Sequence, residues 1–229
     1  MHVPDGFLDA PTSVATAAVA VGGVALALRG ARRELDDRTA PLAGLVALFV
    51  FASQMLTFPI GAGTSGHLLG GALAAVLVGP WTATLAITVV LLVQATLMAD
   101  GGLTALGTNI TLMGVVGVWV GWGVFALARA VLPKRVGSLV PAAACAAFVS
   151  VPVVALTFSA LFAAGGAVPI PFGTVASAMV GVHLVIGLGE AAITALAVAS
   201  IAAVRPDLVH GARPLLGQRV LVLREGQPA

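Results

Sequence analysis

Residues 139–164 read LVPAAACAAFVSVPVVALTFSALFAA and contain no charged side chain. A helix needs about 20 mostly apolar residues to cross the hydrocarbon core of a bilayer. The chain has 229 residues, of which 59% are hydrophobic and 9% charged, and its mean hydropathy is +1.10. This composition predicts an all-α fold, a polytopic membrane helix bundle with about seven transmembrane helices. The other six predicted spans are 11–29, 42–60, 67–80, 81–99, 104–131 and 173–203.

The third predicted span, HLLGGALAAVLVGP at 67–80, is too short to cross a typical bilayer by itself and is rich in glycine. Irregular backbone at membrane depth is tolerated where protein covers it or where it lines a cavity. We therefore expect this segment to tilt, to break or to begin inside a cavity. Six spans with a re-entrant piece are the alternative count.

The basic residues set the expected orientation. All eleven lie in or beside three segments: Arg29, Arg32, Arg33 and Arg38; Arg129, Lys134 and Arg135; Arg205, Arg213, Arg219 and Arg224. With seven spans these segments share one side, which the positive-inside rule makes cytoplasmic. The N-terminus is then outside the inner or plasma membrane. One transmembrane domain, 1–203, begins with a segment at 1–10, and residues 204–229 form a cytoplasmic tail.

The first two residues can chelate a metal ion. The α-amine of Met1, the amide nitrogen of His2 and the Nδ1 atom of its ring can close two chelate rings, and one more nitrogen completes a square plane. Such a site suits Ni(II), Cu(II) or low-spin Co(II). Taken alone, Met1-His2 is more simply a start codon and its neighbour. However, the rigid, turn-forming and then apolar stretch at 3–8 favours a terminus that folds into the bundle.

His67 is the expected source of the fourth nitrogen, because it follows the glycine-rich run 61–66 at the start of an outer helix. A single histidine there fits equally well as a helix cap or as an interhelical hydrogen-bond partner, but the pairing with His2 favours a ligand. The chain start lacks the basic residues of a cleaved signal, with Asp5 and Asp9 in their place, so we expect the N-terminus to be kept. His2 is large enough that removal of Met1 is expected to be disfavoured.

Four stretches resemble the CbiM/NikM family, the substrate-binding components of energy-coupling-factor importers for cobalt and nickel. They are MHVPDGFL at 1–8, GTSGHLLGG with GPW within 63–81, GLTALGTN at 102–109 and GVHLVIGLGEAAIT at 181–194. The resemblance spans residues 1 to about 203 and implies that Met1, His2 and His67 hold the ion. Some relatives carry a fused C-terminal extension with additional spans, whereas this chain ends in a polar tail.

The resemblance implies that the bound substrate is Co²⁺ or Ni²⁺ and that the chain is a transport subunit rather than an enzyme. It also implies a transmembrane coupling (T) subunit and two cytoplasmic ATPase subunits as partners, with a small companion membrane subunit as a separate polypeptide. The sequence has no GxxxxGK[ST] motif, so ATP hydrolysis must come from elsewhere. No organic cofactor is expected, and no basic and aromatic pattern indicates nucleic acid.

Several polar residues are expected to surround the site. His183 and Glu190 are seven residues apart on one helix face. They either orient a ligand or form an interhelical hydrogen bond that fixes the bundle. Asn109 and Ser65 are further residues of this supporting kind, and Gln54, Gln94 and Thr108 can belong to the same cluster. Asp100, in an outer turn, is expected to be a solvated helix cap rather than a ligand.

Two other functions are compatible with parts of the sequence. A proton-coupled secondary transporter would use His183 and Glu190, although no pair of inverted repeats is evident. A rhomboid-like intramembrane serine protease would use Ser65 in Gly63-Thr64-Ser65-Gly66 with His183 as its base. The protease interpretation leaves the N-terminal motif unexplained.

Overall fold

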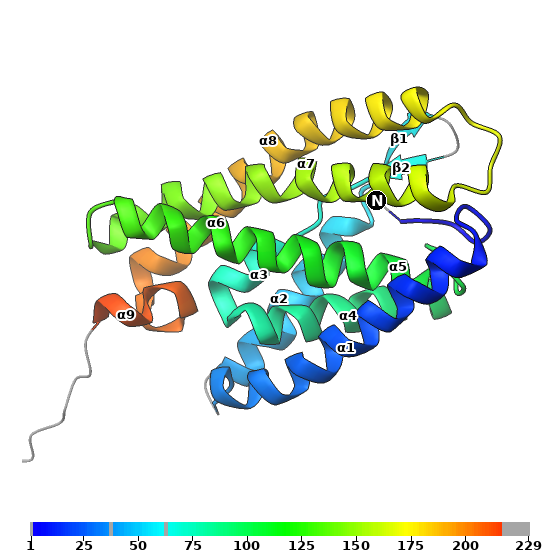
Figure 1. Ribbon diagram of the computed structural model, residues 1–229. Coiled ribbons are helices and arrows are strands. Elements are labelled where there is room, and N and C mark those ends of the chain that lie inside the picture. The colour runs from blue at the N-terminus through cyan, green and yellow to red at the C-terminus, as the bar shows by residue number, and fades with distance from the viewer. Residues whose placement is uncertain (1, 37–38, 62–63, 217–229) are drawn as a thin grey trace, which may run out of the picture.

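The computed structural model describes residues 2–36, 39–61 and 64–216, without the side chains of 58–65, and is a bundle of helices (Figure 1). Five helical segments are long and apolar enough to cross a membrane, which confirms the predicted membrane helix bundle. They are α1 (Ala10–Glu34), α4 (Pro80–Leu97), the segment Leu106–Val131, the segment Val136–Gly165 and α8 (Phe172–Val204).

Two shorter helices occupy the other predicted spans. Helix α2 (Thr39–Gln54) is apolar but has only 16 residues. Helix α3 (Gly71–Val78) has 8 residues, and at 1.5 Å per residue it is about 12 Å long, well below the thickness of the hydrocarbon core. The expectation of a short, interrupted third segment is confirmed, whereas a count of seven spans stays a prediction.

The segments Leu106–Val131 and Val136–Gly165 are each composite. The first consists of α5 (Leu106–Asn109), the π-helix η1 (Ile110–Gly117) and α6 (Val118–Val131). The second begins with the 3₁₀ turn η2 (Val136–Ser138) and continues as α7 (Leu139–Gly165). Helices α7 and α8 lie side by side along much of their length (Figure 1).

A small hairpin departs from the predicted span 42–60. Helix α2 ends at Gln54, and β1 (Phe58–Gly61) pairs antiparallel with β2 (Thr64–Gly66). Pro59 has no N–H for a helical hydrogen bond and disfavours helical dihedrals at the preceding residue. The predicted helix was therefore too long at its C-terminal end, because hydropathy does not register the proline.

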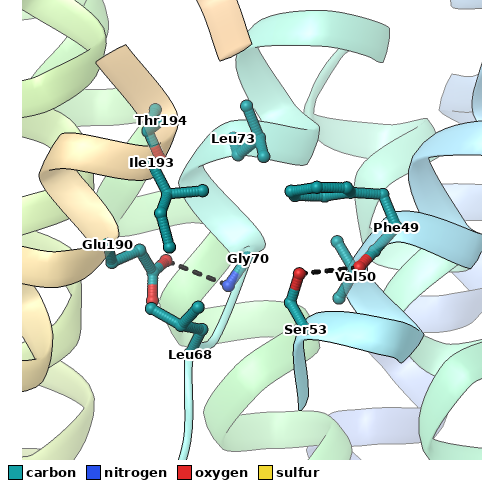
Figure 2. Close-up of a pocket in the computed structure, with 9 residues that line it drawn as sticks. All are labelled: Phe49, Val50, Ser53, Leu68, Gly70, Leu73, Glu190, Ile193 and Thr194. Atoms are coloured by element: carbon teal, nitrogen blue, oxygen red, sulfur yellow. Dashed lines mark hydrogen bonds between the residues drawn. The ribbon is translucent and has the colours of Figure 1, made fainter. Parts of the chain in front are cut away.

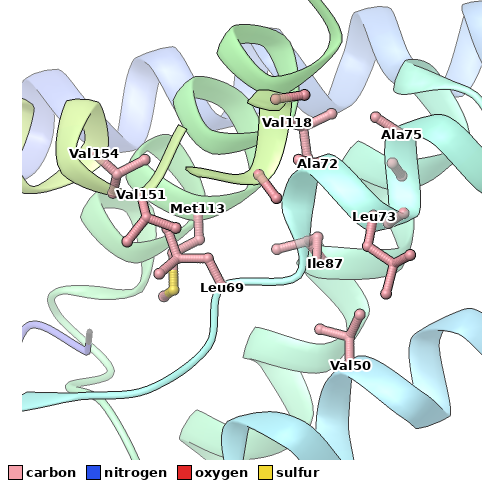
Figure 3. Close-up of a cluster of buried hydrophobic side chains, with 14 of the residues drawn as sticks. Val50, Leu69, Ala72, Leu73, Ala75, Ile87, Met113, Val118, Val151 and Val154 are labelled. Carbon is pink, nitrogen blue, oxygen red and sulfur yellow. The ribbon is translucent and has the colours of Figure 1, made fainter. Parts of the chain in front are cut away.

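Helix α3 lies at the centre of the bundle, and all eight of its residues are buried. In Figure 3, α3 and the adjoining Leu69 are surrounded by apolar residues from α2, α4, η1, α6 and α7. Gly121 of α6 allows the closest approach, since a Cβ atom there would lie 2.7 Å from the Cβ atom of Ala72. Short backbone segments at membrane depth survive when protein covers them in this way.

The chain after α8 turns back onto the bundle. It forms η3 (Pro206–Leu208), η4 (His210–Ala212) and α9 (Arg213–Leu216), and Val209, Gly211 and Ala212 are buried. The start of the expected tail 204–229 is thus packed against the helices. Residues 217–229 lie outside the described part of the chain.

Candidate metal centre

The N-terminal segment is laid into the bundle. Val3 and Phe7 are buried, and the Phe7 ring packs against Phe158 and Phe162 of α7. The backbone continues this contact, because the Phe7 carbonyl accepts from Ala167 N at 3.0 Å and Asp9 N donates to the Gly165 carbonyl at 2.7 Å. For residues 2–9 the expected folding into the bundle is confirmed, and Met1 lies outside the described residues.

Asn109 holds the backbone of Val3 from both sides. Val3 N donates to Asn109 Oδ1 at 2.8 Å, and Asn109 Nδ2 donates to the Val3 carbonyl at 3.1 Å. The same carbonyl accepts from Gly102 N at 3.0 Å. Gly101 (φ +87°) adopts a left-handed backbone, and a Cβ atom there would lie 3.1 Å from Asn109 Nδ2. Asn109 and the 101–102 turn therefore set the position of the neighbouring His2.

The His2 ring is buried between two polar groups. Its Nε2 atom is 3.0 Å from Gln94 Oε1, and its Nδ1 atom is 3.1 Å from Asp100 Oδ1. A neutral imidazole carries one N–H, so both contacts are hydrogen bonds only when the ring is protonated. Loss of the Nδ1 proton frees the ring nitrogen that the predicted chelate requires.

Asp100 was wrongly predicted to be a solvated cap. Its side chain is 28% exposed and lies against His2, and this contact with the His2 ring holds the pKa of Asp100 below its usual range despite partial burial. No sequence signal pairs Asp100 with a residue 98 positions earlier. The sequence indicated an acidic residue in the turn before Gly101-Gly102, but it did not indicate that His2 is its partner.

His67 stacks on His2, with ring centroids 4.4 Å apart and planes inclined by 30°. The ring is fully buried, and its Nδ1 atom is 2.8 Å from the Leu68 carbonyl. A carbonyl only accepts hydrogen bonds, so Nδ1 carries the proton and Nε2 keeps its lone pair. That Nε2 atom is buried and has no hydrogen-bond partner among the described residues. It is therefore available as a metal ligand.

Glu190 fixes the segment that follows His67. Its carboxylate accepts from Leu69 N at 2.6 Å and from Gly70 N at 2.9 Å, and Figure 2 shows it directed at the start of α3. Gln54 of α2 adds a third anchor, because its Nε2 donates to the Leu69 carbonyl at 2.8 Å. Glu190 thus makes the interhelical contact that was one of its two expected roles, and this contact fixes the backbone adjoining a predicted ligand.

His183 lies on the same face of α8 as Glu190 but does not bond to it. Its Nδ1 donates to the Met179 carbonyl of its own helix at 2.7 Å. By the same reasoning as for His67, its Nε2 is unprotonated, and this atom is buried without a hydrogen-bond partner among the described residues. His183 is thus a second buried histidine whose Nε2 lone pair is free to bind a metal ion.

Two other predicted site residues are placed differently. The hydroxyl oxygens of Thr108 and of Thr16 in α1 are 2.7 Å apart. This hydrogen bond joins α5 to α1 and so supports the helical turn that carries Asn109. Ser65 pairs through its backbone with Pro59, and its side chain lies outside what is described. The proposed pairing of Ser65 with His183 therefore stays untested.

Side chains alone do not make a conventional metal site here. In the described part of the chain, no three His, Cys, Asp or Glu side chains form a group able to hold a metal ion. What the fold does bring together is the His2 ring, the Nε2 atom of His67 and the buried main chain at Val3. This arrangement suits a borderline metal that accepts nitrogen ligands and tolerates main-chain donors.

Known proteins resemble this chain in both sequence and fold. Residues 2–208 match the family model described as "Cobalt uptake substrate-specific transmembrane region", CbiM. The fused nickel transport protein NikMN of Rhodobacter capsulatus is 38% identical over 99% of this chain and 69% of its own length. The cobalt transport protein CbiM of Sorangium cellulosum is 37% identical, covering 91% of this chain and 94% of its own length.

A crystal structure of a transition metal transporter superposes with a TM-score of 0.81 at 29% identity, over 89% of this chain and 93% of the other. The five apolar helices and the family match identify a multi-pass protein of the cell membrane. By sequence over nearly its whole length, and by fold, this chain belongs to the CbiM family of cobalt uptake transmembrane proteins.

Proposed function

We propose that this chain captures divalent cobalt or nickel at the outer face of the membrane for import. Four nitrogens would hold the ion: the Met1 amine, the amide and Nδ1 nitrogens of His2, and Nε2 of His67. The observation that carries the proposal is the buried, unpartnered Nε2 atom of His67 beside the His2 ring. Unsatisfied buried polar atoms are rare and call for a ligand or another explanation.

The surroundings of the two rings support the proposal. Metal-bound histidines usually donate their other N–H to an acceptor, which fixes the tautomer and the direction of the ring. The Leu68 carbonyl has this role for His67, and Gln94 Oε1 has it for His2. Asn109 and Glu190 act one step further out, because each holds main chain next to one of these histidines.

Import would need the partners that the family resemblance implies, namely a T subunit, two ATPase subunits and a small companion membrane subunit. The proposed topology places the metal segment 1–10 outside and the tail 204–229 in the cytoplasm, around a seven-helix domain at 1–203. Binding is then the step that this chain performs, and ATP hydrolysis elsewhere drives release.

A proton-coupled transporter is a weaker candidate. In that case Glu190 and His183 would exchange protons along a pathway. The Glu190 carboxylate instead accepts two short main-chain hydrogen bonds, and His183 bonds within its own helix. These contacts favour structural anchoring over proton transfer.

The test is Ni²⁺ and Co²⁺ binding to the purified chain, measured by metal analysis and titration. Two residues added ahead of Met1 should abolish binding, because the terminal amine becomes an amide. The same two residues added after Ala229 should leave about one ion bound per chain. Equal binding by both forms would exclude the amine as a ligand.

A second pair of variants tests the fourth nitrogen. His67→Gln should abolish binding, whereas His183→Gln should retain it. In both variants the residue removed is a buried histidine whose Nε2 atom has no hydrogen-bond partner among the described residues. The opposite result would assign the fourth nitrogen to His183.

A further inference from the structure

A groove of about 590 Å³ lies at the opposite end of the bundle, between the C-terminal end of α6 and the segment 210–215. In Figure 1 the chain after α8 packs beside this end of α6. Gly211 makes the close contact, since a Cβ atom there would lie 2.6 Å from the Phe125 ring. Neither wall contributes to the metal centre.

The polar part of the groove is cationic. Arg129 and Lys134 come from the α6 side, and Arg213 comes from the opposite wall. None of the described residues that line the groove is acidic. Lys134 is exposed and has no ion pair within the described ranges, while Arg213 donates to the Glu34 carbonyl at 3.2 Å and lies 3.7 Å from Asp36 Oδ2. The groove therefore attracts an anion.

The floor of the groove is aromatic and contains one unused polar atom. The Trp122 ring stacks on Phe125 at 5.5 Å and meets His210 edge-on, also at 5.5 Å. Burial, together with Arg213, lowers the pKa of His210 to about 4, so the ring is neutral near pH 7. Its Nδ1 atom is buried without a hydrogen-bond partner among the described residues and can bond to a polar ligand.

One edge of the groove joins the apolar outer surface of the bundle. Ala126 and Ala130 line it on α6 and are one turn apart. Next to them on the same helix, Leu127 is 71% exposed and Val131 is 80% exposed. A molecule with an anionic head and an apolar chain would satisfy both parts, whereas an acidic protein surface would leave the apolar edge uncovered.

We infer that this groove binds an anionic phospholipid of the phosphatidylglycerol or cardiolipin class, with the phosphate between Arg129, Lys134 and Arg213 and an acyl chain along α6. Basic pockets between membrane helices bind such headgroups, and tryptophan favours the interface between water and lipid. If the predicted orientation holds, the lipid comes from the cytoplasmic leaflet. The site is independent of metal capture.

The test uses the full chain, stripped of lipid in detergent, with phosphatidylglycerol or phosphatidylcholine added and bound lipid counted by native mass spectrometry. Arg129→Gln with Lys134→Gln should weaken phosphatidylglycerol binding by about 30-fold, because two basic contacts are lost. The matched control is Arg32→Gln with Arg33→Gln, which removes the same charge from exposed positions at the end of α1 and should change binding by less than about 3-fold.

Three outcomes would overturn the inference. Equal loss in both double variants would mean attraction by the general positive field. Full competition by inorganic phosphate at equal concentration would assign the groove to a soluble anion. Unchanged lipid binding in the groove variant would mean that the lipid does not occupy the groove. Thermal unfolding without lipid checks that both variants fold.

Discussion

The two ends of α3 are anchored by the same chemistry and differ in what lies beside the anchor. At the first end, Glu190 of α8 accepts from the backbone N–H groups of Leu69 and Gly70. At the second end, Glu34 of α1 accepts from Trp81 N at 3.2 Å and from Thr82 N at 2.7 Å, in the first turn of α4. Both carboxylates are buried, and each satisfies N–H groups that would otherwise lack partners.

The surroundings separate the two anchors. Glu190 holds the segment that continues from His67, whose Nε2 is buried and unpartnered. Glu34 packs against Gly79 (φ +95°), where a Cβ atom would lie 2.5 Å from its carboxyl carbon, and it closes the break between α3 and α4. A buried carboxylate alone therefore does not indicate a functional site. Both ends have a buried side-chain atom without a hydrogen-bond partner in the described part of the chain, namely His67 Nε2 beside Glu190 and the Thr82 hydroxyl beside Glu34. What distinguishes them is that only His67 offers an imidazole nitrogen, the kind of ligand that cobalt and nickel accept.

Acid should have the largest effect on the metal-binding end. Lowering the pH from 8 to 5 should weaken Ni²⁺ binding by at least about 100-fold, because a proton replaces the metal at the terminal amine. Titration at each pH measures this. A flat affinity between about pH 5 and pH 8 would contradict ligation by the terminal amine.

Replacing each carboxylate with an amide tests the comparison directly. Glu190→Gln should weaken metal binding by about 10- to 100-fold, because an amide offers one acceptor oxygen and the segment after His67 shifts. Both variants should lower the unfolding temperature by a similar amount, because each weakens the hydrogen bonds of a buried carboxylate. Glu34→Gln should nevertheless leave metal affinity within about 3-fold of the parent chain. Metal titration and thermal unfolding of both variants give the result. Equal loss of affinity in the two would mean that α3 transmits any disturbance to the site.

Two substitutions of uncharged residues sharpen the same comparison between the Glu190 and Glu34 ends. Asn109→Ala removes both hydrogen bonds to Val3 and should weaken metal binding by about 10-fold. Thr84→Ala is the matched control at the Glu34 end, where a buried hydroxyl donates to the Pro80 carbonyl at 3.0 Å. It should leave metal affinity unchanged. Unaltered metal affinity in Asn109→Ala would show that the N-terminal segment keeps its position without the two hydrogen bonds between Asn109 and Val3.

The smallest effect concerns the stability of the metal-free protein in strong acid. The pKa of Asp100 is lowered in the folded state, so its contribution is present above the ordinary carboxyl value of 3.8 and is lost as the pH falls below it. Unfolding temperatures between about pH 5 and pH 3 should therefore decline less steeply in Asp100→Asn than in the parent chain. Parallel curves would mean that the contact with His2 does not stabilise the fold.

The metal-binding end could be predicted in outline but not in its connections. Met1, His2 and His67 were predicted from donor chemistry, from charge bias and from motif resemblance, all of which are local in the sequence. Asn109 and Glu190 were expected near the site without known partners. The role of Asp100 was mispredicted, because its partner His2 comes from a distant part of the chain.

By itself, the sequence determined the solvent and most of the helical segments, and it predicted the side of the membrane on which the basic residues gather, because hydropathy and charge act residue by residue. Tertiary structure alone decided that α3 is a buried helix of 8 residues and that residues after Thr57 turn into a hairpin. It also decided which polar groups meet, such as Glu190 with Leu69, 121 positions apart. Those pairs depend on how helices pack, and packing is a property of the whole chain.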